Sequence, residues 1–240
     1  MQRSVSIIGN KETKERTMQK FDTPAPVTTV LDIPAGHIRF IAADRADTTV
    51  DVRPADASKS RDVKAAEQVE VAYGDGMLRI ETPAAKNRIL GPSGFVEVTV
   101  QLPVGSRVEA TAASAEFRGV GRLGDVVFEG AHGSVELDET ESARLTLLAG
   151  DVSVGRLGGP AEITTAKGDI RIAEAVRGTV TLRTEAGEIS VGAAREVSAS
   201  LDAGTSYGRI HNALKNSEGA AAVLNLHATT AYGDITARSL

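Results

Sequence analysis

A short phrase recurs through the second half of this 240-residue chain and constrains the fold more than any other feature. The phrase is a glycine, a mostly polar residue, an aliphatic residue, any residue and usually a second aliphatic residue. Its copies are GSVEL at 133–137, GDVSV at 150–154, GDIRI at 168–172, GEISV at 187–191, GRIHN at 208–212 and GDITA at 233–237. Because the glycines are only 17 to 25 residues apart, the chain reads as a repeat architecture.

Each period contains a second alternating segment, so each period predicts two strands. These segments are ARLTL at 143–147, AEITT at 161–165, TVTLR at 179–183, VSASL at 197–201 and VLNLH at 223–227. Alternation predicts that Ile170 and Ile172 face a core and that Arg171 faces solvent. Strands of this size are about 15 Å long and marginal alone, so the coils must stack. The fold class predicted is all-β, a repetitive β-solenoid or β-helix-like stack of short strands with an N-terminal β-sheet section.

The first half of the chain also predicts strands, but without the short period. Residues 1–17 are interpreted as a disordered extension, 18–117 as the N-terminal β-strand section and 118–240 as the solenoid section, continuous with it. Residues 56–68 are rich in helix formers and predict a helix. IPAG at 33–36 and LPVG at 102–105 look like one turn device used twice, and KNRILGPSG at 86–94 predicts a loop.

The glycine and acid at each corner of the repeat have a structural interpretation. A sharp turn often needs a positive φ, where a Cβ costs about 1–2 kcal/mol, so Gly168 and Gly187 are expected to tolerate valine less well than Gly94. The acids that follow the corner glycines are expected to accept turn amide hydrogen bonds; they are Asp151, Asp169, Glu188 and Asp234. The alternative is a ladder of acids that binds cations, but calcium solenoids use denser repeats with more oxygen ligands per turn.

Composition excludes several classes of protein. The chain has no Cys, so it can hold no disulfide, thiolate metal site or cysteine nucleophile. A net charge of -5 argues against a nucleic-acid binder or an anionic-membrane binder. No apolar stretch approaches the roughly 20 residues that span a bilayer, and residues 1–20 lack the pattern of a secretory leader. A cytoplasmic location is therefore predicted, with Met1 or Met18 as the start.

The strand-rich segments resemble a known family. The segments are FDTPAPVTTVLDIPAGHIRFIAADRADTTVDVRP, DVKAAEQVEVAYGDGMLRI, FVEVTVQLPVGSRVEA, GRLGDVVFEGAHGSVELDET, YGRIHNAL and TAYGDITARSL. Over about residues 18–240 they resemble the actinobacterial β-strand-repeat proteins of the domain of unknown function 4097 family, called putative adhesins or Toastrack-type domains. The resemblance implies a right-handed repetitive all-β fold with no established activity.

No catalytic or metal-binding pattern stands out in the sequence. The four histidines have no short metal-ligand spacing and are expected at the surface or in turns; they are His37, His132, His211 and His227. The serines and threonines are scattered along strands, and no nucleophile elbow or P-loop is present. We therefore assign no catalytic, cofactor-binding or metal residues and no cofactor.

The predicted function is a non-catalytic structural or interaction module that contacts a protein partner or itself, because a solenoid ends in exposed strand edges. The alternative is a carbohydrate-active β-helix enzyme, a lyase or hydrolase. Such an enzyme would act through clustered carboxylates. The acids outside the corners are Glu129, Glu136, Asp138, Glu139 and Glu141. We interpret the cluster at 136–141 as a solvated acidic loop. A small-ligand carrier is a third option and would require a cavity.

Overall fold

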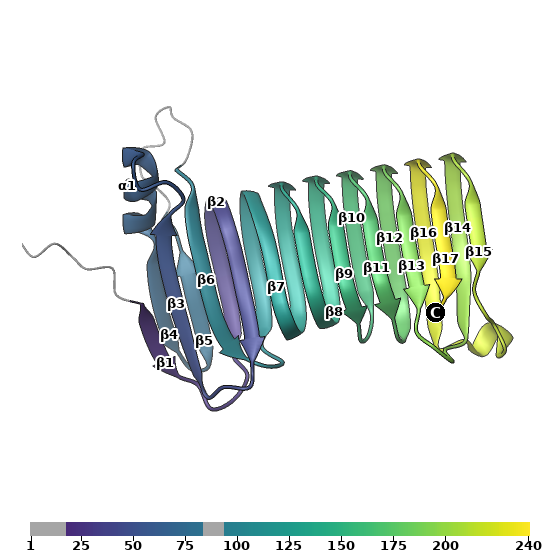
Figure 1. Ribbon diagram of the computed structural model, residues 1–240, viewed down its shortest axis with the longest axis horizontal. Helices are drawn as coiled ribbons and strands as arrows, with labels where there is room; N and C mark the ends of the chain where they lie inside the picture. Colours follow the sequence, from purple (N-terminus) through teal and green to yellow (C-terminus); the bar gives the residue numbers. More distant parts are fainter. Residues whose placement is uncertain (1–17, 84–93) are drawn as a thin grey trace, which may run out of the picture.

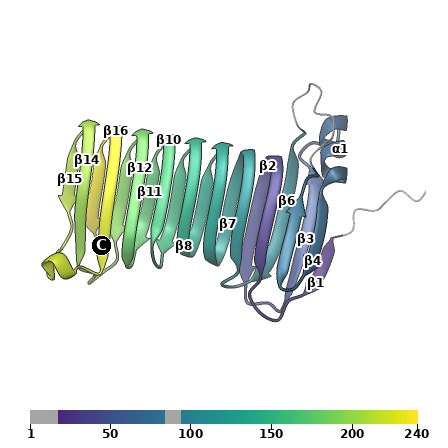
Figure 2. The ribbon, with the colours of Figure 1, turned by 180° about the vertical axis from the view of Figure 1, so that it is seen from behind.

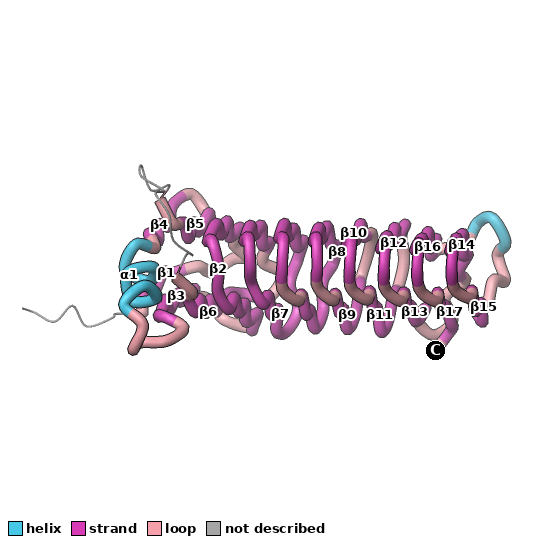
Figure 3. The backbone as a smooth tube through the Cα atoms, turned by 90° about the horizontal axis from the view of Figure 1, so that it is seen from above, coloured by secondary structure: helices cyan, strands magenta, loops and turns pink. Residues whose placement is uncertain are grey.

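The computed structural model describes residues 18–83 and 94–240. Its strands wind as stacked coils into two facing layers, which form one elongated, open sheet (Figure 1), and the view from above shows the two layers side by side along the stack (Figure 3). The predicted repetitive all-β solenoid is confirmed. The predicted extension at 1–17 and all of the predicted 86–94 loop except Gly94 lie outside the described residues.

The elements follow one another with few interruptions. They are β1 (Gln19–Asp22), β2 (Thr28–Ala43), β3 (Asp47–Pro54), α1 (Ser60–Gln68), β4 (Glu70–Gly74), β5 (Met77–Glu81), β6 (Val96–Pro103), β7 (Arg107–His132), β8 (Val135–Ala149), β9 (Val152–Leu157), β10 (Ala161–Lys167), β11 (Ile170–Ala175), β12 (Gly178–Ala186), β13 (Ile189–Ala193), β14 (Ala199–Tyr207), β15 (Ile210–Ala213), η1 (Gly219–Ala221), β16 (Leu224–Tyr232) and β17 (Ile235–Ser239). The predicted helix is confirmed as α1, which begins a few residues later than expected.

The core is a set of aliphatic ladders that run along the stack. In one layer, Ile170 lies between Val152 of the coil before it and Ile189 of the coil after it. In the other layer, Ile163 lies between Leu145 and Leu182. The period-two interpretation of the sequence is therefore right, since these side chains are fully buried between the layers. From β8 onward branched aliphatic side chains fill this thin interior, whereas the coils of β2 and β7 also bury the rings of Phe40, Phe117 and Phe128.

The corner glycines are required by close approach between coils as well as by the predicted positive φ, which four of the six corners have. Gly168 has a φ of 143°, but Gly187, at the same corner of the next coil, is not in the left-handed region. A Cβ at Gly187 would lie 2.0 Å from the carbonyl oxygen of Gly168, and a Cβ at Gly168 would lie 2.1 Å from that of Gly150. The glycines therefore stack directly on one another, and a side chain at any level would push the coils apart.

The last two coils are stacked in the reverse of their sequence order. β16 pairs in parallel with both β12 and β14, and β17 pairs with both β13 and β15. The coil formed by β16 and β17 therefore lies between the coil of β12 and β13 and that of β14 and β15. The coil of β14 and β15, which we call the terminal coil, ends the stack although it is not last in the sequence (Figure 1).

The opposite end of the stack has a different construction. β3 pairs antiparallel with β1 and β6, β4 pairs antiparallel with β5, and α1 packs beside β3 (Figure 2). Gly94 lies against the helix, where a Cβ would be 2.3 Å from the carbonyl oxygen of Arg61. The reason for expecting Gly94 to tolerate valine better than Gly168 or Gly187 therefore fails, because Gly94 itself packs closely on α1.

The two proline–glycine turns are not one device. β2 continues as a strand through the IPAG corner, and its two halves pair with β5 and β6 in different layers. At LPVG the strand ends, since β6 stops at Pro103 and β7 starts at Arg107, with Gly105 at a φ of 79°.

Candidate functional site

One edge of β14 lacks a neighbouring strand within residues 18–83 and 94–240. β14 pairs with β16 along one side only. In a parallel ladder, the N–H and C=O of a residue point to the same neighbour and alternate along the strand. The carbonyl of Ser198 accepts the N–H of Leu224, whereas the N–H of Ala199 points the other way and donates to the carbonyl of Lys215.

This alternation directs the backbone groups of three residues away from β16. They are Leu201, Ala203 and Thr205, whose N–H and C=O groups have no backbone partner on the outer side among the described residues. Unpaired groups of this kind form a template for another strand. We call the outer side of β14 at these residues the free edge.

The core is left half covered beside the free edge. Leu201 and Ala203 pack on the core but are only partly buried. In the facing strand β15 every residue is exposed, and Ile210 has 45% of its surface exposed, whereas its repeat equivalent Ile170 has none. Asn212 follows in the position that Ile172 occupies in an interior coil. The backbone of the terminal coil therefore follows the same path as the other coils, but fewer of its side chains are apolar and face the core.

Side-chain contacts at the corner add to the backbone ladder that joins the terminal coil to its neighbour. The guanidinium Nη2 of Arg209 lies 2.9 Å from Oδ2 of Asp234, and the N–H of Arg209 donates to Oδ1 of the same carboxylate at 2.9 Å. The N–H and the guanidinium of Arg209 lower the pKa of Asp234 below its usual value. Next to this pair, the rings of Tyr207 and Tyr232 stack at 5.0 Å with planes 4° apart.

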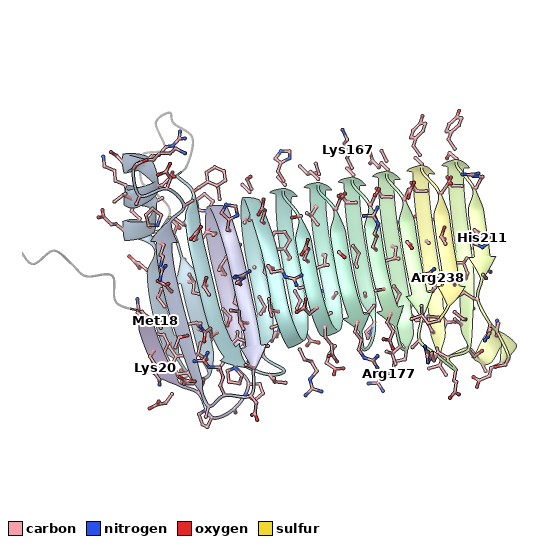
Figure 4. The ribbon with its side chains drawn as sticks, viewed as in Figure 1. Met18, Lys20, Lys167, Arg177, His211 and Arg238 are labelled. Carbon is pink, nitrogen blue, oxygen red and sulfur yellow. The ribbon has the colours of Figure 1, made fainter. Side chains whose placement is uncertain are left out.

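Below the free edge, the segment that links β15 to β16 folds against the end of the stack. Glu218 donates its N–H to Oγ of Ser198 at 3.1 Å, and Lys215 donates its N–H to Oγ of Ser239 at 2.9 Å. The carbonyl of Lys215 in this segment accepts the N–H of Ala199, so the free edge begins at Leu201. The upper part of the end of the stack, which includes His211, stands clear of the segment (Figure 4).

Of the four corner acids, Asp151, Asp169 and Asp234 accept amide hydrogen bonds as predicted, but between coils, whereas the described contacts include none to the carboxylate of Glu188. Oδ1 of Asp151 accepts the N–H of Asp169 at 2.9 Å, and Oδ1 of Asp169 accepts the N–H of Glu188 at 2.9 Å. Asp234 repeats the contact with Arg209. Each of these three acids therefore joins its own coil to the next one along the stack.

The acids at 136–141 lie on strand β8, so the predicted acidic loop is wrong. Alternation along the strand and the bulge beside it spread these side chains over different neighbours. Arg118 contacts Glu136 at 2.9 Å and Asp138 at 2.6 Å, while Glu139 lies 3.9 Å from Arg156. Glu129 is on β7, and all four histidines are exposed, as expected.

The sequence analysis missed a ladder of buried threonines, which it described as scattered. A threonine stands three residues before the corner glycine in four coils and donates its hydroxyl to a corner-glycine carbonyl of the adjacent coil. The pairs are Thr165 with Gly150, Thr184 with Gly168, Thr230 with Gly187 and Thr205 with Gly233. The spacing T-x-x-G could have revealed the ladder. A threonine that recurs at a fixed distance before a repeated turn occupies the same structural position in each coil.

The described surface gives no ready-made ligand site. Residues 18–83 and 94–240 contain no group of three or more metal-ligating side chains. A hollow opens between α1 and the corner of β2, with polar residues such as Asp32, Gln68 and Glu81 in its wall. No helix in the same residues is long and apolar enough to cross a membrane.

A two-layer parallel solenoid with an uncovered terminal coil defines a class of repeat protein that presents strand edges. The sequence matches the Toastrack DUF4097 family over residues 1–238, and the chain belongs to that family. The family match confirms the resemblance drawn from the strand-rich segments. No curated protein matches the sequence.

Several solved structures are similar to this chain at low sequence identity. A protein from Bacteroides fragilis described as a putative adhesin is 14% identical, with a TM-score of 0.56 over 94% of this chain and 98% of that chain. A Parabacteroides distasonis protein described as a putative lipid binding protein is 12% identical, with a TM-score of 0.45 over 92% and 96% of the two chains. A putative cell adhesion protein from Clostridium sporogenes is 13% identical, with a TM-score of 0.41 over 93% and 99%. The B. fragilis structure shows that the fold is shared.

Proposed function

We propose that this protein is a non-catalytic interaction module that binds a protein partner along the free edge of β14. The observation that carries the proposal is the row of outward-directed backbone groups at Leu201, Ala203 and Thr205. An extended segment of a partner can add to such an edge as a further strand, with main-chain hydrogen bonds for affinity and side-chain contacts for specificity.

The half-covered core supports the proposal. A strand laid on the free edge would cover Leu201 and Ala203 as an additional coil does elsewhere in the stack. The edge also carries no lysine or proline, the residues with which natural sheets block edge pairing. Residues 18–117 and 118–240 act in this proposal as one continuous unit that presents the terminal coil.

The carbohydrate-active alternative has weaker support. Arg118 pairs with both Glu136 and Asp138, and Glu139 lies beside Arg156. Glu141 lines an open hollow with Asp125, but no aromatic ring, on which a sugar could stack, is among the residues of its described wall. A cytoplasmic location remains a prediction that the lack of cysteine favours, and cell fractionation with an antibody to the native protein tests it.

Substitution of Ala203 by proline tests the proposed function. Proline removes an N–H that the described fold does not use and is tolerated on the open side of an edge strand. We expect A203P to lose at least tenfold in capture of partner proteins from the host lysate and to lose amide protection at 201–205 on partner binding. G204A, which leaves all backbone N–H groups of the free edge in place, should behave as the wild type. Equal capture and equal protection with A203P would overturn the proposal.

A further inference from the structure

We infer that the free edge of β14 pairs with the same edge of a second copy of this chain, end to end and antiparallel about a two-fold axis at Ala203. The inference rests on the proposed function, because it names the occupant of the same edge. It is carried by the symmetry of the free groups, by the charges beside them and by the closure of a two-fold contact on itself.

The hydrogen-bonding groups fix the register. In an antiparallel ladder, residues directly opposite each other exchange both of their hydrogen bonds. When Ala203 lies opposite Ala203 of the second copy, Leu201 lies opposite Thr205 and Thr205 lies opposite Leu201. This register pairs all three outward-directed residues on each copy. A register shifted by two residues would leave an outward-directed residue on each copy unpaired or would require the N–H of Ala199, which is already donated to Lys215.

The side chains fit the same register. Leu201 meets the smaller Thr205, and Ala203 meets Ala203, so a large side chain faces a small one across the half-covered core. On the solvent side, Asp202 falls opposite Gly204 of the second copy, which has no side chain. The carboxylate of Asp202 is the only charge of β14. This register keeps the Asp202 carboxylates of the two copies from lying directly opposite each other, where they would repel.

The two-fold arrangement closes on itself. A two-fold axis perpendicular to the layers brings β15 toward β15 of the second copy at the same time as β14 meets β14. The contact uses the same edge on both copies, so no third copy can add to it. At the other end of each stack the outer strands β1 and β4 run antiparallel to their neighbours, so that end does not repeat the free edge (Figure 1). The contact involves one coil per copy, which is small for a stable dimer, so the association is expected to be weak and concentration-dependent.

Substituting Gly204 by a positively or a negatively charged residue tests the register, because the two substitutions should have opposite effects on dimerisation. The structure leaves open space for a Cβ at Gly204, so both variants should fold. In the dimer, G204K would place an ammonium opposite Asp202 of the second copy at two symmetric positions, and G204D would place a carboxylate there. We expect G204K to tighten dimerisation about threefold to tenfold and G204D to weaken it by a similar factor, measured by sedimentation over a concentration series.

The matched controls use Thr146, which is exposed in the same row of outward side chains at the middle of the stack. T146K and T146D change the net charge equally but should leave the dimer constant unchanged. A monomer at all concentrations, or equal effects of the charges at both positions, would overturn the inference.

A single cysteine gives a covalent test in a chain that has none. Opposed residues of a hydrogen-bonded antiparallel pair have Cα atoms about 5.5 Å apart, which a disulfide can span. We expect A203C to form a disulfide-linked dimer under mild oxidation and T146C to remain largely uncross-linked. If A203C fails to cross-link while A203P still loses partner capture, the second-copy inference is wrong and the proposed function stands. If A203P retains full capture, the proposed function itself is wrong.

Discussion

The interior coil of β12 and β13 and the terminal coil of β14 and β15 are built from the same repeat phrase but have different surroundings. β12 is paired on both sides, by β10 and β16, whereas β14 is paired on one side only. In the interior coil, Ile189 is fully buried, and in the terminal coil its equivalent Ile210 is 45% exposed. The comparison shows that one backbone path can support the fold inside the stack and leave a strand edge exposed at its end.

The largest effect expected is at the glycine corner. G168V would place a Cβ about where the carbonyl of Gly150 lies, so the coils must separate or the chain must rearrange. We expect a loss of about 4 kcal/mol or more, seen as a fall in Tm of about 10 °C or more. G204V in the terminal coil, where the Cβ meets open space, should change Tm by less than about 2 °C. Similar shifts for the two variants would show that the corners are not closely stacked.

The aliphatic ladder gives the next largest contrast. I172A removes a buried side chain and leaves a cavity between the layers, at a cost of about 3 kcal/mol in the free energy of unfolding. I210A removes a side chain that is already half in water and should cost less than about 1 kcal/mol. Chemical denaturation of both variants measures the contrast. Equal losses would mean that the terminal coil is covered in solution by something other than the described residues.

The threonine ladder should show a smaller difference. T184V keeps the shape of the side chain but removes the hydroxyl that donates to the carbonyl of Gly168 at 3.0 Å, which should cost about 1 kcal/mol. T205V makes the same change in the terminal coil, where Thr205 donates to Gly233 at 3.1 Å in a less buried setting, and water can replace the hydroxyl. Thermal unfolding should therefore place T205V closer to the wild type than T184V.

The smallest effect is a pH response confined to the terminal coil. The folded pKa of Asp234 lies below its usual value of 3.8 because its carboxylate accepts the N–H of Arg209 and pairs with its guanidinium. The contribution of this contact is present above pH 3.8 and is lost as pH falls through the lower folded pKa. Amides of β15 should therefore exchange faster as the pH is lowered in this range, after correction for intrinsic exchange. D234N should remove this pH dependence, and an unchanged profile would contradict the assignment.

Much of the fold could be predicted because it depends on local pattern. Period-two alternation placed Ile170 and Ile172 in the core, and the absence of alternation at 56–68 located α1. The stacking order could not be predicted, because the phrase at 208–212 fits any level of the stack. Its loose form, with Asn212 in an inward position, was the signal that this coil is not covered on both sides.

The candidate site escaped prediction for a related reason. Its parts are backbone groups, and the direction of the N–H of Ala203 depends on which strand lies beside β14. The sequence predicted exposed edges as a class but could not locate them. Gly94 shows the same limit, since only the folded chain brings it against Arg61 of α1.

Amide exchange along β14 tests the central claim most directly. At low protein concentration, the account predicts fast exchange at Leu201, Ala203 and Thr205 and slow exchange at their ladder equivalents Val180, Leu182 and Thr184. Raising the concentration should slow exchange at the first three residues alone. Slow exchange at these residues in a dilute monomer would contradict the existence of the free edge.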